Sequence, residues 1–469
     1  MESQTFATAI LAAGKGTRLK SKRAKVLHSI AGKTLLQHVL DAVLKVTSPD
    51  QVFVVVGHQA EEVERAVADT GVHFVLQKQQ LGTGHAVQCL CESVRGLGDL
   101  LVLSGDVPLI RAETIENLRD FHQAQKAAMT ILTARPENPF GYGRVVRVEP
   151  TSPDVGAIIE QKALADDQQH IGEINSGIYV FQIDTLYRHI GALQSNNAHG
   201  EYYLTDMAAI LRAAGERVVA YEVGDATEVL GANTISEMME LEGALRTQAA
   251  RQLMAQGVTI HRPETCVIDA DVTVGADTIV EPFVQLLGKT QVGEDCRIRS
   301  YSVIQDSQIG DSVLIRNSCV VDGATIDNGA FVGPFAHLRP GSQIGREAHV
   351  GNFVETKNAR VGEKSKANHL TYLGDVSVGS GCNIGAGVIT CNYDGVNKHP
   401  TQIGDRVFVG SNATLVAPVS LEDDSYVAAA SCITEPVPAG ALALGRSRQA
   451  VKPGWVKQRR AAQQKKKEG

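Results

Sequence analysis

Residues 332–349 read VGPFAH, LRPGSQ and IGREAH, three hexads that each begin with an aliphatic residue. The same spacing continues at Val350 and returns between Ile403 and Ile433, often with glycine in the second position and a small or aliphatic residue in the fifth. A period of six matches neither the period of two of a strand nor the 3.6 of a helix. It predicts a coil with three flat faces of six residues each, in which every first-position side chain enters one interior stack. Forty-five glycines and a single tryptophan fit such a core of small aliphatic residues.

This periodic segment, which begins near Val267, resembles the hexapeptide-repeat family. The resemblance implies a left-handed parallel β-helix, an exception to the usual right-handed crossover. It also implies a homotrimer with acyl-acceptor and CoA sites in the clefts between neighbouring chains. The repeat slips near Ile326 and Val378 and breaks at Thr390–Pro400. We expect a loop at the break, because insertions leave a solenoid as loops and loops often carry function.

The N-terminal half has a different pattern, in which short apolar runs alternate with helical stretches. Strands are predicted at Ala7–Ala12, Val52–Val56, Val72–Leu76 and Leu100–Leu103, and helices at Thr34–Val46 and Ala60–Ala68. This alternation predicts a Rossmann-like α/β domain with a mainly parallel sheet. Apolar residues every three or four positions then predict one amphipathic helix between the two halves. The expected organisation is a nucleotidyltransferase-type domain over 1–233, a linker helix over 234–256, a β-helix domain over 257–454 and a basic tail over 455–469.

Composition limits the kinds of partner. A formal net charge of −7 argues against a nucleic-acid partner, because phosphate backbones reward clustered Lys and Arg. The basic run Lys457–Lys467 is interpreted as a solvated, frayed terminus. No apolar run reaches the ~18 residues of a membrane span. Eight cysteines without a CxxC pair are interpreted as reduced packing residues, and the apolar stretch Phe6–Ala13 lacks the flanks of a secretory signal. We therefore expect a cytoplasmic protein.

A glycine-rich loop, Leu11-Ala-Ala-Gly-Lys-Gly-Thr-Arg18, ends the first predicted strand. Glycines there let backbone N–H groups approach a polyphosphate, although the same residues also suit a plain tight turn. Lys25 follows at a spacing that can return a cation to the loop, and Asp106 ends the strand Leu100–Leu103. A strand-end Asp is often a turn or cap residue. Beside the loop and the lysine we prefer a Mg²⁺ ligand, because a carboxylate facing a phosphate cradle suits that ion.

These motifs, with Gln77, Leu81-Gly-Thr83 and Ser104-Gly-Asp106, resemble the nucleoside-triphosphate sugar-1-phosphate nucleotidyltransferase family over residues 5 to about 230. The resemblance implies that the base of UTP is held by Leu11, Ala12, Ala13, Gln77, Gly82 and Thr83. It places the triphosphate on Gly14–Arg18, with Arg18 and Lys25 as catalytic cations. It further assigns nucleotide-sugar contacts to Ser104, Gly105, Gly141, Glu160 and Asn175, and Mg²⁺ ligands to Asp106 and Asn233. Two residues depart from the family pattern: Ala24 replaces a frequent proline and Ser104 replaces an aromatic residue, which leaves the role of Ser104 open.

The C-terminal half carries polar residues that a pure scaffold does not need. His369 is third in the hexad that begins at Ala367, an outward position where a lone histidine is usually just solvated. Arg339, Lys357 and Tyr372 lie at spacings that can stack them on neighbouring coils. Acyl transfer to an amine needs a base that titrates near neutrality, as histidine does. Two cations that face the acceptor indicate that the acceptor carries a phosphate.

The two halves together resemble the family of bifunctional N-acetylglucosamine-1-phosphate uridyltransferase/glucosamine-1-phosphate acetyltransferases. The match includes Leu338-Arg-Pro-Gly341, Asn368-His-Leu-Thr-Tyr-Leu-Gly-Asp375 and Thr390-Cys-Asn-Tyr-Asp-Gly395. It implies that His369 deprotonates the amine of glucosamine-1-phosphate for attack on acetyl-CoA. It assigns the acceptor phosphate to Arg339 and Lys357, the sugar to Tyr372 and Asn383, and acetyl-CoA to Ala386, Asn392, Tyr393, Ser411, Ala429 and Arg446. The product, N-acetylglucosamine-1-phosphate, would then react with UTP to give UDP-N-acetylglucosamine, a precursor of peptidoglycan and lipopolysaccharide.

Two other interpretations remain open on sequence grounds. A nucleotidyltransferase with one activity could use the β-helix only for oligomerisation or effector binding, and His369→Ala would then leave every activity intact. A non-enzymatic scaffold would release no pyrophosphate from UTP and would have no use for Lys25, Asp106 and Asn233 together.

Overall fold

The computed structural model describes residues 6–197 and 200–466. The chain forms two compact units, residues 1–248 and 249–469, and each is treated separately below. The outermost residues of the expected first domain and tail, 1–5 and 467–469, lie outside the described part of the chain.

The first unit is built on a sheet with strand order β11-β7-β10-β6-β1-β4-β5. Its parallel half consists of β1 (Phe6–Leu11), β4 (Val52–Val56), β5 (His73–Leu76) and β6 (Asp99–Ser104). The strand β10 (Ile174–Gln182) runs antiparallel to β6 and to β7 (Met129–Ala134), while β11 (Val218–Glu222) is parallel to β7. The hairpin β8 (Arg144–Arg147) and β9 (Val155–Ile159) is antiparallel. The predicted parallel strands are confirmed, and the antiparallel part was not foreseen.

Helices cover both faces of this sheet. The described helices of the unit are α1 (Leu35–Val43), α2 (Ala60–Ala66), α3 (Thr83–Gln88), α4 (Ala112–Gln125), α5 (Ile183–His189) and α6 (Met207–Ala213). In β1, Ile10 enters one apolar cluster, whereas Ala7 and Ala9 enter the other. Side chains that alternate between two buried faces explain why the strand is a continuous apolar run.

The predicted linker helix is α7 (Ile235–Ala255), and the boundary between the two units falls inside it. Met238 and Leu241 pack in the first unit with Ile30 and Leu35. The later residues Ala250 and Leu253 belong to the core of the second unit. One amphipathic helix therefore contributes apolar residues to two separate cores.

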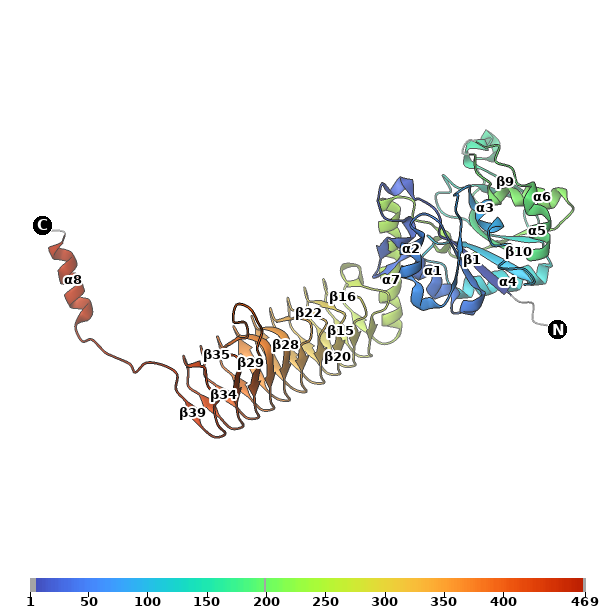
Figure 1. Ribbon diagram of the computed structural model, residues 1–469. Coiled ribbons are helices and arrows are strands. Elements are labelled where there is room, and N and C mark those ends of the chain that lie inside the picture. The colour runs from blue at the N-terminus through green and yellow to red at the C-terminus, as the bar shows by residue number, and fades with distance from the viewer. Residues whose placement is uncertain (1–5, 198–199, 467–469) are drawn as a thin grey trace. The chain divides into compact units, whose positions relative to one another are not determined.

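The second unit is a left-handed parallel β-helix, as the hexads predict, and its coils are yellow to red in Figure 1. Its strands run from β12 (Thr259–Ile260) to β39 (Leu442–Ala443) and form an 11-stranded and a 17-stranded sheet within the described residues. The strands near the polar region are β25 (His337–Leu338), β27 (His349–Asn352), β28 (Glu355–Val361), β29 (Lys366–His369), β30 (Tyr372–Val378), β31 (Asn383–Ile384), β32 (Ile389–Cys391) and β33 (Thr401–Ile403).

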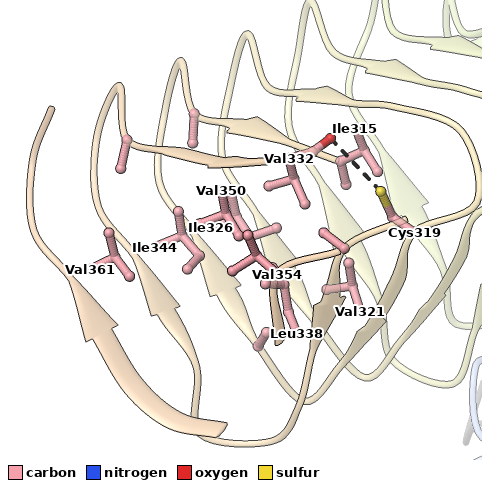
Figure 2. Packing of buried hydrophobic residues seen from close by; sticks show 14 of the residues in the cluster. Ile315, Cys319, Val321, Ile326, Val332, Leu338, Ile344, Val350, Val354 and Val361 are labelled. Carbon is pink, nitrogen blue, oxygen red and sulfur yellow. Dashed lines mark hydrogen bonds between the residues drawn. The ribbon is translucent and has the colours of Figure 1, made fainter. Parts of the chain in front are cut away.

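The interior of the coil is the aliphatic ladder that the hexads specify. Ile298 pairs with Ile315, and Ile315 pairs with Val332, so each of these coils takes 17 residues. Figure 2 shows Ile315, Val332 and Val350 stacked on successive coils, each fully buried. Burial of one such side chain stabilises the fold by ~1.5–3 kcal/mol, which explains how a glycine-rich chain folds without a large aromatic core.

The predicted break in the repeat is a loop. Asn383 pairs with Phe408, a step of 25 residues in place of 17. The extra residues leave the coil between β32 and β33, and Tyr393 and Lys398 form a bridge within them.

Two interpretations of the sequence need correction. All eight cysteines are free, but only Cys266, Cys296, Cys319 and Cys382 are buried, and Cys432 is exposed and therefore not a packing residue. The basic tail, expected to be frayed, forms helix α8 (Trp455–Lys465), and its residues 455–464 are exposed. None of the described helices has both the length and the apolar character needed to cross a membrane.

Candidate active sites

The glycine loop after β1 lies against Lys25 because Gly16 has no side chain. Gly16 has φ 61°, and a Cβ there would lie 2.7 Å from Cβ of Lys25. Only glycine therefore allows the loop to pass this close to the lysine. The loop walls a cavity of about 580 Å³, whose lining includes Leu11, Ala12, Ala13, Gly14, Lys25, Gln77, Gly82, Thr83, Ser104 and Asp106. Gly105, next to the last two, donates its backbone N–H to the carbonyl oxygen of Leu11 at 3.0 Å.

Four predicted residues meet beside this cavity at the carboxyl edge of the sheet. The ammonium group of Lys25 forms an ion pair with Asp106, and these two side chains are 16% and 14% exposed. Lys25 Nζ and Arg18 Nη2 donate hydrogen bonds to Asn233 Oδ1 at 2.9 Å and 2.8 Å. The backbone N–H of Ala232 donates to the carbonyl oxygen of Asp106 at 3.2 Å, which fastens the segment that carries Asn233. Two cations and two oxygen ligands thus face the place where ligands of open α/β sheets bind.

The predicted sugar contacts gather around the loop that precedes β8. The backbone N–H of Gly141 donates to Gln161 Oε1 at 3.1 Å, and that of Asn175 donates to the carbonyl oxygen of Gly143 at 2.8 Å. Asn175 is 8% exposed, and its Nδ2 donates to the hydroxyl of Tyr179 at 2.9 Å. The pKa of Glu160 is raised, first by burial of its carboxyl group and then by the nearby charge of Asp206.

In the second unit, His369 ends β29 and lies beside Asn352 of β27. The two residues are partners in the strand register, and His369 Nδ1 lies 2.6 Å from Asn352 Oδ1. An amide oxygen can only accept a hydrogen bond, so Nδ1 carries the proton. Nε2 then keeps its lone pair, which is the state that a general base needs.

Cations gather on the neighbouring face. Arg339 Nη1 donates to Glu355 Oε1 at 2.9 Å. The pKa of Lys357 is lowered, first by a hydrogen bond with Lys398 and then by the charge of Lys398, with a smaller contribution from Arg339. Positive side chains held this close together favour an anionic ligand such as a phosphate. In the strand register Glu355 pairs with Tyr372, which places the tyrosine one coil along the same face.

The structure does not bring all four predicted acceptor residues onto one face. Arg339, Lys357 and Tyr372 lie in or beside strands of the 17-stranded sheet, whereas Asn383 belongs to β31 of the 11-stranded sheet.

The predicted acetyl-CoA residues lie mostly along one edge of the coil above His369. Hydrogen bonds link successive coils there, from Gly387 N to His369 O at 3.2 Å and from Asn412 N to Ala386 O at 2.7 Å. The same edge continues with the carbonyl oxygens of Ser411 and Ala429, which accept from Ala430 N at 2.8 Å and Arg446 Nη1 at 3.1 Å.

The two predicted residues of the loop lie apart from this edge. Asn392 is 8% exposed, and its Nδ2 donates to Asp375 Oδ2 at 2.5 Å. The Tyr393 hydroxyl donates to the carbonyl oxygen of Gly395 in its own loop at 2.6 Å.

Comparison with known proteins decides the family. Residues 8–169 match the MobA-like NTP transferase domain, 271–306 match the bacterial transferase hexapeptide (six repeats), and 400–435 match the hexapeptide repeat of succinyl-transferase. A Bifunctional protein GlmU of Koribacter versatilis is 58% identical over 99% of both chains. Proteins of the same name from Solibacter usitatus and Streptococcus agalactiae are 48% and 45% identical, over 97% and 95% of this chain and 98% and 96% of their own. The chain belongs to the GlmU family.

Membership of the GlmU family makes the chain a bifunctional enzyme, with a nucleotidyltransferase unit and a hexapeptide-repeat acyltransferase unit. The interpretation with a single activity and a purely structural β-helix is thereby set aside. A solved structure of CMP:2-keto-3-deoxy-manno-octonic acid synthetase complexed with CTP also aligns, at 20% identity over 52% of this chain and 99% of its own, but its TM-score of 0.41 carries no argument.

Three residues near the two GlmU-type sites were missed from the sequence. The pKa of Tyr142 is raised by burial and then by the charges of Glu237 and Asp106, and its hydroxyl accepts a hydrogen bond from the backbone of Gly231. It therefore connects the sugar loop with the segment that carries Asn233. Asn352 and Lys398 were missed because a contact between coils is visible only when the register is known, and the break before β33 conceals that register.

Proposed function

We propose that the second unit acetylates glucosamine-1-phosphate with acetyl-CoA, and that the first unit then transfers a uridylyl group from UTP to the N-acetylglucosamine-1-phosphate. The products are CoA, pyrophosphate and UDP-N-acetylglucosamine. The observation that carries this proposal is the cluster of Arg18, Lys25, Asp106 and Asn233 beside the glycine-loop cavity.

In the first unit the chemistry is alignment and charge neutralisation. The phosphate oxygen of the sugar is already anionic and attacks the α-phosphorus of UTP, so no protein base or nucleophile is needed. Arg18 and Lys25, which rest on Asn233 and Asp106, neutralise the charge that develops as pyrophosphate leaves.

A magnesium ion fits the oxygen ligands of this site. Asp106 and Asn233 offer one carboxylate and one amide oxygen, and both already converge on the ammonium group of Lys25. The described residues contain no cluster of three or more His, Cys, Asp or Glu side chains that could hold a metal alone. Mg²⁺ usually binds one or two carboxylates together with substrate phosphates. Asp106 and Asn233 would hold it, and the ion would supply further charge neutralisation to the triphosphate.

In the second unit His369 acts as the base. Its Nε2 takes a proton from the acceptor amine, and the amine nitrogen attacks the thioester carbon of acetyl-CoA. The C–S bond breaks, and the CoA thiolate leaves and takes up that proton. Asn352 accepts from Nδ1–H throughout and stabilises the protonated ring. Arg339, Lys357 and Lys398 hold the phosphate of the acceptor.

We further propose a homotrimer in the cytoplasm, with the acetyltransferase site completed by a neighbouring chain. Exposed aromatic rings stack along the corner of the coil that carries His369: Phe283 on Tyr301 at 5.1 Å and Phe335 on Phe353 at 5.3 Å. Contiguous exposed apolar side chains usually mark an interaction surface. The place of Asn383 on the other sheet also fits a site that two chains share. Eight free cysteines agree with a reducing compartment.

A substrate-omission series tests the proposal. The protein is mixed with glucosamine-1-phosphate, acetyl-CoA, UTP and Mg²⁺, and each is left out in turn. Without UTP, we expect CoA release and accumulation of N-acetylglucosamine-1-phosphate. Without acetyl-CoA, we expect no pyrophosphate until N-acetylglucosamine-1-phosphate is added. Pyrophosphate release that needs no acetylated sugar would overturn the proposed order.

A further inference from the structure

The side-chain amide of Gln77 is fixed from several sides in the wall of the cavity. The residue is 3% exposed, and its backbone N–H donates to the carbonyl oxygen of Val56 at 2.8 Å. Its Nε2 lies 3.1 Å from the carbonyl oxygen of Gly82 and 3.0 Å from His85 Nδ1. A carbonyl oxygen can only accept a hydrogen bond, so the amide atom that faces Gly82 must be the NH₂ group.

This geometry also determines the state of His85. The second hydrogen of the Gln77 NH₂ group can be used only if His85 Nδ1 is an acceptor, and the ring proton must then be on Nε2. The imidazole and the Gly82 carbonyl together hold the amide in one of its two orientations. Gly82 has φ 103°, and a Cβ there would lie 2.6 Å from the carbonyl oxygen of Tyr202, so glycine is needed to place its carbonyl group.

One atom of the amide stays free for a ligand. Gln77 Oε1 accepts no hydrogen bond from any residue that the structure describes, whereas both hydrogens of Nε2 have acceptors. The residue lines the cavity together with Gly82 and Thr83, on the wall assigned to the base. This wall therefore offers the ligand a hydrogen-bond acceptor and withholds the donor.

We propose that His85 is a positioning residue that sets base selectivity by locking Gln77 with its oxygen as the free group. The proposal rests on the proposed function, in which this cavity takes UTP. Uracil carries an N3–H donor that satisfies the oxygen, whereas cytosine has a lone pair at N3 that the oxygen repels. A Gln77 amide turned by 180° would instead present NH₂ and suit the cytosine edge. The selectivity for UTP over CTP thus depends on a residue whose Nδ1 bonds the amide and not the base.

Paired variants of His85 test the role in the full-length enzyme. His85→Leu keeps the bulk but removes the acceptor, which leaves a buried N–H of Gln77 without a partner. His85→Asn keeps an acceptor, because its Oδ1 is attached to Cγ as Nδ1 is. We expect His85→Leu to raise the KM for UTP about fivefold and to lower the UTP/CTP ratio of kcat/KM about tenfold, the scale of one neutral hydrogen bond. We expect His85→Asn to stay within about twofold of wild type, and the KM for N-acetylglucosamine-1-phosphate to be unchanged in both.

A double-variant cycle shows whether His85 acts through Gln77. After Gln77→Ala, the further change His85→Leu should have no effect on the UTP/CTP ratio, because the amide that it positions is gone. The inference is overturned if His85→Leu keeps the wild-type ratio, if it weakens both nucleotides and the sugar phosphate equally, or if its effect persists on the Gln77→Ala background. A wild-type enzyme without uridylyl transfer would instead refute the proposed function.

Discussion

At the scale of single residues, the acetyltransferase site depends on which nitrogen of His369 carries a proton. The ring lies at an exposed corner, where two tautomers and several rotamers would otherwise be available. Asn352 restricts this choice, because its Oδ1 lies 2.6 Å from Nδ1 and leaves Nε2 as the base. A hydrogen bond that selects the reactive tautomer can matter more for rate than for stability.

Substitution of Asn352 measures this effect. We expect Asn352→Ala to lower kcat for acetyl transfer about 10- to 100-fold with little change in the KM values, since an orienting group is lost and no substrate contact. Asn352→Asp should keep most of the activity and move the acid limb of the pH–rate profile to higher pH, because a carboxylate stabilises the protonated ring. An Asn352→Ala enzyme with wild-type kcat would contradict this role, and pyrophosphate release by the same preparations serves as the control.

The residues that were predicted and those that were missed differ in one respect. Lys25, Asp106 and His369 belong to local motifs, so a short stretch of sequence reveals them. Asn352, His85 and Lys398 act on a neighbouring side chain, and their importance depends on hydrogen bonds and charges that only the folded chain creates. Local sequence therefore predicts the groups that react more readily than the groups that position them.

At the scale of elements, a buried ionic cluster supports the antiparallel part of the first sheet. Glu173, just before β10, accepts hydrogen bonds from Thr133 at 2.7 Å, Arg147 at 2.6 Å and Arg135 at 3.0 Å. Burial alone would raise the pKa of this carboxyl group, but the hydrogen bonds and charges of these partners outweigh it and hold the pKa below its ordinary value of 4.5. Its side chain is 3% exposed, so solvent screens these interactions little.

The lowered pKa gives a pH-dependent stability with a definite sign. A group whose pKa falls on folding stabilises the fold above its unfolded value, and that contribution disappears as the pH drops below 4.5 toward the folded value. Glu173→Gln should cost about 3 kcal/mol near pH 7, because two buried arginines lose their counter-ion. Calorimetry should show the gap between wild type and variant narrowing between about pH 5 and 3. A gap that is constant or widens over this range would contradict the assignment.

The same scale shows which elements a sequence can specify. The hexads fix the β-helix, because Ile315, Val332 and Val350 reveal both the period and the inward positions. The antiparallel strands β8 to β10 were not foreseen, since an apolar run such as Ile178–Phe181 is the same in a parallel and in an antiparallel neighbour. Strand direction is decided by connections that leave no pattern of their own.

At the scale of the whole molecule, the proposed trimer makes the exposed aromatic corner an interface. Phe335 and Phe353 are 52% and 54% exposed. We expect light scattering of the wild type to give about three times the 50.1 kDa of one chain. Phe335→Glu should weaken the assembly, since a buried charge at an interface is costly, and should reduce acetyl transfer more than uridylyl transfer. Val148→Glu, at another exposed apolar residue, is the control. A Phe335→Glu protein of unchanged mass would show that this corner does not join chains.

The central claim is that one chain holds two separate active sites, and one measurement addresses it directly. CoA and pyrophosphate release are followed together in the wild type, Lys25→Met and His369→Ala, with glucosamine-1-phosphate, acetyl-CoA, UTP and Mg²⁺ present. We predict that Lys25→Met still releases CoA at the wild-type rate, while its pyrophosphate release falls at least 100-fold. His369→Ala should release neither product from glucosamine-1-phosphate, yet regain wild-type pyrophosphate release when N-acetylglucosamine-1-phosphate is added. The account is contradicted if Lys25→Met loses both activities, or if His369→Ala keeps CoA release at the wild-type rate.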